Sequence, residues 1–159
     1  MTKAETDLPI SGFVAQETDF SKLFDRLGPS TEQAIRHEVI EPAVNAEHFP
    51  SNNQFCLITI LGHSDRVDTA GLSSEQRRAK ELDASDERAS SAADWVFAQI
   101  TDALNAAGET PPASVATATN FDIVTVPCGA ANLMKLVPAN EAERAQNRRV
   151  QFMISTFTP

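Results

Sequence analysis

The sequence contains no apolar run approaching the ~18 residues that a membrane-spanning helix needs. Its first seven residues are mostly polar or charged and lack the apolar segment of a secretory signal. Internal repeats and lipidation motifs are also missing. Two alternatives follow: either the protein stays where it is made, or the sequence is the trimmed form of an exported protein.

Cysteine and basic residues are scarce. The two cysteines, Cys56 and Cys128, lack metal-ligand spacing and lie in apolar, strand-like runs, where we expect buried free thiols. A disulfide between them remains open, since it requires neighbouring strands. The 22 acidic residues outnumber the 13 basic residues and give a net charge of −9. Because nucleic-acid binding needs a basic surface, we exclude nucleic acid as the partner, although one local basic pocket is compatible with this charge.

The 159 residues are enough for one domain with its own hydrophobic core. We expect a loose leader over residues 1–8 and a single domain over residues 9–159. Within the domain, apolar periodicity and turn residues predict alternating strands and helices. The expected elements are a strand within 8–15, a short helix over 20–27, a helix over 30–46 that Pro42 kinks or splits, a buried strand over 54–62, a long helix over 84–107 with Ser85 as its N-cap, a strand over 115–126 and a last strand over 149–155.

Charged or polar loops are expected over residues 66–81, with one helical turn around 75–80, and over residues 131–146. An order of strand, helix, strand, helix, strand, strand around one core predicts an α/β sandwich. We therefore expect helices packed on one face of a mixed sheet.

The buried strand over 54–62 ends at Gly62 and is followed by His63, Ser64 and Asp65. Ligands of open α/β sheets bind at the carboxyl ends of the strands, so Asp65 is the first candidate for a binding residue. The alternative is that Asp65 only caps a turn or a helix start. His63 is expected to be structural, because no second histidine or nucleophile accompanies it.

Three polar clusters occur in order at predicted element ends. They are Gly62-His63-Ser64-Asp65, then Ala84-Ser85-Asp86-Glu87-Arg88-Ala89, then Arg144-Ala145-Gln146-Asn147-Arg148-Arg149-Val150. With these three motifs the sequence resembles the OmpA-like peptidoglycan-binding domain, the family that includes the C-terminal domains of OmpA, Pal and MotB. The resemblance covers roughly residues 54–155 and implies a β-α-β-α-β-β fold.

The resemblance also implies a ligand, the diaminopimelate of the peptidoglycan stem peptide, whose side chain ends in an ammonium and a carboxylate. Asp65 is expected to pair with the ammonium, and Arg88 to bind the carboxylate with two parallel N–H donors. Arg148 is expected to border the same pocket, and Ser64 and Asn147 complete the candidate set from the same motifs. From the residues alone, the favoured interpretation is instead that Arg88 is a solvated helix arginine and that Arg148 is a charged strand end.

Arg88 is also expected near a helix N-terminus, where exposed N–H groups favour an anion. The chain departs from the family pattern in an insertion around residues 67–80. It also has Glu81 where the family often has asparagine, and Ala84 where the helix motif has leucine. Glu81 is therefore expected either to repel the ligand carboxylate or to add a second partner for its amine.

The resemblance implies non-catalytic binding that anchors an envelope or secretion-type assembly to the cell wall, in the periplasm or cell envelope. No cofactor and no metal is expected. The alternative is a degenerate OmpA-like fold that serves as a protein–protein or structural module; Glu81, the insertion and the missing export signal favour it. A hydrolase that uses Asp65 and Glu81 as an acid/base pair is a poor third reading, because nothing indicates a leaving-group pocket.

Overall fold

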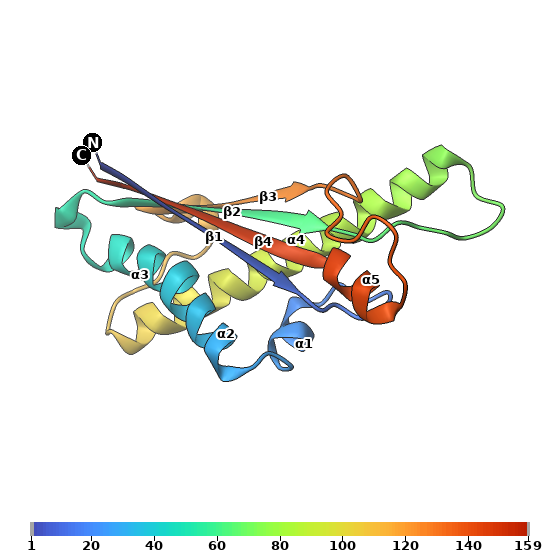
Figure 1. The fold of residues 1–159 in the computed structure, drawn as a ribbon. Coiled ribbons are helices and arrows are strands. Elements are labelled where there is room, and N and C mark those ends of the chain that lie inside the picture. The colour runs from blue at the N-terminus through green and yellow to red at the C-terminus, as the bar shows by residue number, and fades with distance from the viewer. Residues whose placement is uncertain (1, 159) are drawn as a thin grey trace.

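A mixed four-stranded sheet with the strand order β1-β4-β2-β3 forms one layer of the molecule, and the start of α4 projects beyond it (Figure 1). The computed structural model describes residues 2–158. β4 pairs antiparallel with both β1 and β2, whereas β2 and β3 run parallel. The strands are β1 (Thr2–Ser11), β2 (Phe55–His63), β3 (Phe121–Pro127) and β4 (Arg149–Thr158).

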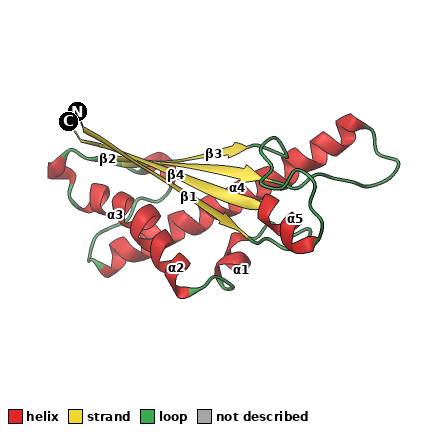
Figure 2. Cartoon of the chain, in the orientation of Figure 1, coloured by secondary structure: helices red, strands yellow, loops and turns green. Residues whose placement is uncertain are grey.

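Helices α1 to α4 lie on one side of this sheet, and α5 lies near the end of β4 where that strand begins (Figure 2). The helices are α1 (Phe20–Phe24), α2 (Pro29–Ile35), α3 (Glu41–His48), α4 (Ser74–Ala106) and α5 (Glu141–Asn147). The predicted fold class is confirmed: this is an α/β sandwich with helices packed on one face of a mixed sheet.

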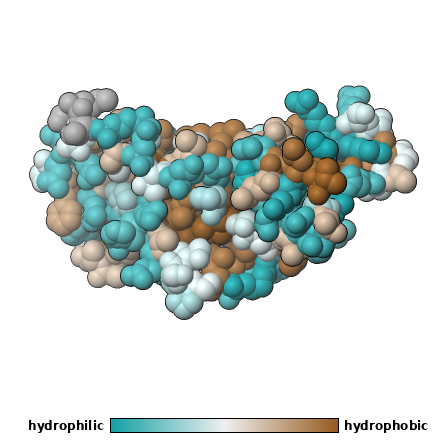
Figure 3. Space-filling model, in the orientation of Figure 1, coloured by the Kyte–Doolittle hydropathy of each residue, from teal (hydrophilic) through white to brown (hydrophobic). Residues whose placement is uncertain are grey.

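The core forms where alternating strand residues meet one stripe of α4. Cys56, Ile58 and Ile60 alternate along β2 and are fully buried. Their partners on α4 recur every three or four residues, the spacing that places side chains on one helix face: Ala89, Ala92, Val96, Ile100 and Leu104. On the outside, Figure 3 shows polar residues over much of one face of the molecule, interrupted by apolar areas.

The expected leader is wrong for residues 2–8, which belong to the edge strand β1. This strand pairs along its whole length with β4, from Thr2 opposite Thr158 to Ser11 opposite Arg149. It also ends at Ser11 rather than near residue 15. The pairing joins opposite ends of the sequence, and the mostly polar sequence of this segment gave no local signal of it.

The predicted break near Pro42 is confirmed, and it takes the form of a π-helical turn over Arg36–Ile40. Proline has no backbone N–H, so a regular hydrogen bond to the carbonyl four residues earlier is lost. The helical turn just before this point contains one extra residue, so the N–H of Glu41 donates to the carbonyl of Arg36, five residues earlier.

The long helix begins earlier than predicted. Ser73 is its N-cap and forms a capping box with Gln76, in which each side chain accepts from the other residue's backbone N–H. Ser85 is therefore a buried residue inside α4 and not its N-cap. Consequently Arg88 lies well inside the helix, and the expectation that a helix N-terminus adjoins it is wrong.

Two smaller predictions also need correction. Residues 115–117 form a 3-10 turn, so the strand predicted over 115–126 is the shorter β3. The expected loop over residues 131–146 contains most of α5, capped by the side chain of Asn140 on the N–H of Glu143. Both cysteines are free thiols; Cys56 lies at the start of β2, whereas Cys128 follows the end of β3.

A cleft lined by arginines and carboxylates

A cleft of about 350 Å³ opens where β2 ends, between α4, α5 and the loop that follows β1. The structure brings together five of the six candidate residues in its lining: Ser64, Asp65, Glu81, Arg88 and Arg148. The sixth, Asn147, does not line the cleft, but its side-chain amide donates to Asp65 at 2.9 Å. Sequence motifs far apart in the chain therefore meet at one place.

Close packing between β2 and α4 sets the position of these residues. A Cβ atom added to Gly62 would lie 1.8 Å from the carbonyl oxygen of Ser85, so only glycine permits this approach. The Ser85 hydroxyl donates to the carbonyl of Leu82 at 2.8 Å and accepts from the N–H of Gly129 at 2.9 Å. Gly62 and Ser85 thus hold the strand end against the helix.

The Asp65 carboxylate is nearly buried and is already held by residues of α5. Its Oδ2 accepts from Nη1 of Arg144 at 2.8 Å, and its Oδ1 accepts from Nδ2 of Asn147 at 2.9 Å. A second amino group of Arg144 donates to Asp68, also at 2.8 Å. Asp65 is therefore a tethered carboxylate at the strand end and not a simple turn cap.

Arg88 is 2% exposed and fixed at three points. Its Nε donates to the carbonyl of Glu17 at 3.0 Å, and its Nη1 donates to the carbonyl of His63 at 3.1 Å. The guanidinium lies 5.2 Å from the ring centroid of Phe13, within the range of a cation–π contact. Burial, and then the positive charge of Arg148, lower the pKa of Arg88 to about 10, so it stays protonated at neutral pH.

Arg148 is held in a similar way. Its Nε donates to the carbonyl of Phe13 at 2.9 Å, and its Nη2 pairs with Glu141. Within the described residues, neither Nη2 of Arg88 nor Nη1 of Arg148 has a hydrogen-bond partner, although both side chains line the cleft. Two fixed guanidinium groups therefore offer N–H donors to whatever enters.

Glu81 faces the cleft from α4, and one of its oxygens accepts from the N–H of Val67 at 2.9 Å. It thereby ties the loop after β2 to the helix. Ser64 reaches the cleft from the strand end, while its N–H donates to the carbonyl of Gly129 at 2.9 Å.

The charge of the cleft is opposite to that of the whole chain. Although the net charge of the chain is −9, five basic and three acidic side chains line the cleft. The basic side chains are Arg66, Lys80, Arg88, Arg144 and Arg148, and the acidic side chains are Asp65, Glu81 and Glu141. The local basic pocket that the overall charge left possible is therefore present.

Two neighbouring residues do not enter the cleft lining. His63 is buried, and burial followed by the charge of Arg149 lowers the pKa of its imidazole to about 4, so it is neutral at pH 7. Arg149 donates to the carbonyls of Asn147 and Asn132, at 3.4 and 2.9 Å. Both residues brace the strand end from outside the cleft.

Several residues of the cleft were not among the predicted site residues, and three of them are informative. Arg144 belongs to the third motif, yet nothing in the sequence indicated that its side chain reaches Asp65. Glu141 lies in the α5 segment that was expected to be a loop. Gln16 comes from the loop after β1, where its φ of 63° lies in the left-handed region. The only available signal was Asn140 followed by acidic residues, a typical helix start.

Nothing in the described part of the chain indicates a metal centre, since no group of three or more histidine, cysteine or acidic side chains is placed to hold one. Among the helices of residues 2–158, none combines the length and apolar character needed to cross a membrane.

Over nearly its whole length the chain is similar to OmpA-like domains. One solved match is the cell wall anchor of the T6SS from Pseudomonas aeruginosa, with 16% identity and a TM-score of 0.44, covering 98% of this chain and 82% of that one. Another is the peptidoglycan-associated lipoprotein from Burkholderia pseudomallei, with 18% identity and a TM-score of 0.41, covering 91% and 87%. A third is the OmpA-like domain of FopA1 from Francisella tularensis, with 13% identity and a TM-score of 0.44, covering 96% and 73%.

No protein-family model matches the sequence, and no curated protein matches it either. Identities and scores at this level do not establish a ligand. The function proposed next therefore depends on the residues of the cleft.

Proposed function

We propose that the cleft binds the zwitterionic side chain of diaminopimelate in a peptidoglycan stem peptide, without catalysing a reaction on it. The carboxylate of that side chain binds Arg88 and Arg148, and its ammonium binds Asp65 and Glu81. The protein then anchors an envelope or secretion-type assembly to the cell wall, from the periplasmic side.

The observation that carries this proposal is the pair of guanidinium groups in the cleft. Arg88 and Arg148 each use other N–H groups to hold backbone carbonyls and keep one terminal nitrogen free of partners among the described residues. The two charges repel each other, since that of Arg148 lowers the pKa of Arg88. An anion between them relieves this repulsion, and a carboxylate matches the geometry of two N–H donors.

The ammonium end has two carboxylates available. Each oxygen of Asp65 has two lone pairs, so the bonds from Arg144 and Asn147 leave room for one more donor. Glu81 uses one oxygen on the N–H of Val67, and its other oxygen makes no hydrogen bond to residues 2–158. Of the two roles considered for Glu81, we therefore assign it that of a second partner for the amine.

Retention on purified diaminopimelate-type sacculi tests this function. Asp65→Asn and Arg88→Lys should each lower the retained fraction by at least tenfold. Asp65→Asn removes one partner of a desolvated charge pair, which costs ~2–5 kcal/mol, and Arg88→Lys keeps the charge but removes the parallel N–H donors. The matched controls are Asp68→Asn, which alters the exposed partner of the same Arg144, and Arg149→Lys, which alters an arginine outside the cleft. Equal retention of all five proteins would refute the proposal.

One observation favours a second function, that of a protein–protein module without a wall ligand. Residues of the loop between β3 and α5 expose large apolar side chains, with Met134 54%, Leu136 68% and Val137 86% exposed. If wild-type protein does not bind sacculi at all, while it does bind an assembly partner through this loop, the module is the correct function.

A further inference from the structure

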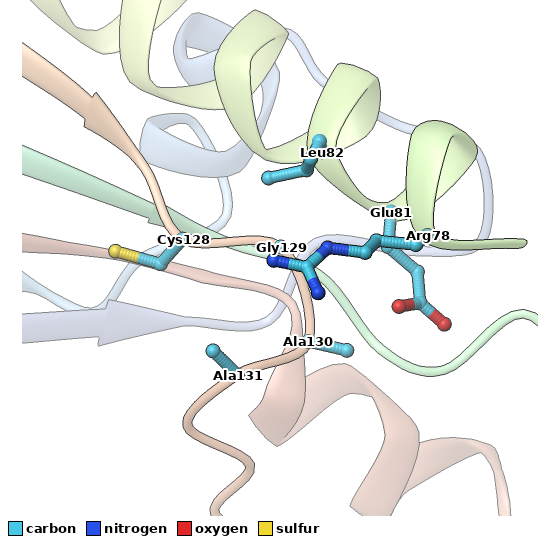
Figure 4. Close-up of a pocket in the computed structure, with 7 residues that line it drawn as sticks. All are labelled: Arg78, Glu81, Leu82, Cys128, Gly129, Ala130 and Ala131. Carbon is cyan, nitrogen blue, oxygen red and sulfur yellow. The ribbon is translucent and has the colours of Figure 1, made fainter. Parts of the chain in front are cut away.

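A second cavity of about 270 Å³ shares Glu81 with the cleft, and Figure 4 shows the residues that line it. Its walls are Arg78, Glu81 and Leu82 from α4, and residues 128–131, which follow β3. The wall from α4 belongs to the part of the helix that Figure 1 shows projecting past the ends of β2 and β3. Arg78 lies within residues 67–80, the expected insertion relative to the OmpA-like family pattern.

Two hydrogen bonds hold Gly129 in the wall opposite α4. The N–H of Gly129 donates to the hydroxyl of Ser85, and its carbonyl accepts from the N–H of Ser64, both at 2.9 Å. Gly129 has a φ of +56°, and an added Cβ would lie 3.4 Å from Cδ2 of Leu82. The hydrogen bonds therefore hold this wall in place, and the positive φ together with the nearby Leu82 favours glycine at position 129.

The lining of the cavity combines one cation, Arg78, and one carboxylate, Glu81, with apolar groups and a thiol. Arg78 makes no hydrogen bond or ion pair with residues 2–158, and Figure 4 shows its guanidinium reaching toward Gly129 and Ala130. Ala130 and Ala131 supply methyl groups, and burial raises the pKa of the Cys128 thiol, which keeps it neutral. Such a lining suits a short side chain beside a carboxylate.

The two cavities are parts of one continuous surface. Glu81 lines both of them, and Ser64 lines the cleft while its backbone holds Gly129 in the second cavity. Because Glu81 lines both, a peptide bound in the cleft can extend past Glu81 into the second cavity. A volume of about 270 Å³ lies below the roughly 300–1,000 Å³ of pockets for drug-sized ligands, so it fits a single small residue.

We propose that this cavity is a second subsite that binds an alanine with a free carboxylate, the residue that follows diaminopimelate in a stem peptide. Arg78 binds the carboxylate, and Ala130, Ala131 and the Cys128 thiol contact the methyl group. This subsite rests on the proposed function of the cleft, and it gives the protein a preference for stem peptides that have kept their terminal alanine.

Calorimetric titration with three synthetic stem peptides tests the subsite. The first ends at diaminopimelate, the second adds one alanine with a free carboxylate, and the third ends in alaninamide. The wild type should bind the second peptide roughly fivefold more tightly than the other two, which corresponds to about 1 kcal/mol for a partly exposed charge pair.

Two variants locate the effect. Arg78→Gln should abolish the preference while leaving the affinity for the first peptide unchanged, and Ala131→Leu should abolish it by filling the cavity. Arg77→Gln is the matched control, because this neighbouring arginine of α4 lines neither cavity.

The outcomes separate the two proposals. Equal affinity of the wild type for all three peptides would overturn the subsite and leave the cleft intact. A preference that survives in Arg78→Gln would also overturn it. If no peptide binds, the proposed function fails and the subsite fails with it.

Discussion

Nη1 of Arg144 lies 2.8 Å from Oδ2 of Asp65, and this ion pair joins α5 to the end of β2. Asp65, the candidate partner for the ligand ammonium, is thus already paired with Arg144 of the same chain. A ligand ammonium must share Asp65 with Arg144, which makes Arg144 an internal competitor.

Arg144→Gln should therefore raise the affinity for free diaminopimelate by a few fold, because Asp65 loses its competing cation. The same change should lower the free energy of unfolding by no more than ~1 kcal/mol, since Arg144 is a third exposed. Calorimetric titration and urea denaturation measure the two effects. A loss of binding would show instead that Arg144 contacts the ligand carboxylate.

Arg88→Lys should weaken both the fold and the binding. Lysine keeps the charge but cannot replace the two bonds to the carbonyls of Glu17 and His63 or the contact with Phe13. We expect a loss of about 1–3 kcal/mol in the free energy of unfolding, and a diaminopimelate affinity at least tenfold lower. Arg149→Lys, measured in parallel, should leave the affinity unchanged; an equal loss in both variants would contradict the role given to Arg88.

The three motifs predicted which residues come together better than they predicted the element boundaries. Asp65, Arg88 and Arg148, from three separate motifs, line one cleft, while their role in binding a ligand stays a prediction. The start of α4 was wrong because Ser85-Asp86-Glu87 looks like a helix start, whereas Gly71 and Ser73 look like a loop. The capping-box spacing distinguishes the two, because Ser73 has Gln76 three residues later whereas Ser85 has Arg88 there; this signal in the sequence was overlooked.

Other features depend on contacts between distant parts of the chain. The first six residues of β1, 2–7, were missed because their pairing partners lie in β4, at the other end of the sequence. α5 was missed because its short polar sequence lacks an apolar stripe. The ion pair of Arg144 with Asp65 was not predicted either, because it also joins residues that are far apart in the sequence.

Gly62→Ala should destabilise the protein severely. The new methyl group would lie 1.8 Å from the Ser85 carbonyl oxygen, so the strand and the helix must separate. We expect a loss of about 3 kcal/mol or more in the free energy of unfolding. Gly28→Ala is the control: no atom lies within 4 Å of its added Cβ. Similar urea midpoints for the two variants would show that the close approach of β2 to α4 is wrong.

His63 should make stability depend on pH. Its pKa is about 4 in the fold and near 6.5 in the unfolded chain, so the unfolded state binds a proton first as the pH falls. Between pH 7 and pH 5 this linkage should remove about 2 kcal/mol from the free energy of unfolding. In His63→Gln the loss over this range should be smaller by that amount. An unchanged pH dependence in the variant would contradict a buried, neutral His63.

The most direct measurement is a crystal structure of the protein soaked with diaminopimelate. It should show the ligand carboxylate between Nη2 of Arg88 and Nη1 of Arg148, and the ammonium within hydrogen-bond distance of Asp65 and Glu81. An empty cleft at saturating ligand, or a ligand bound elsewhere on the surface, would contradict the proposed function.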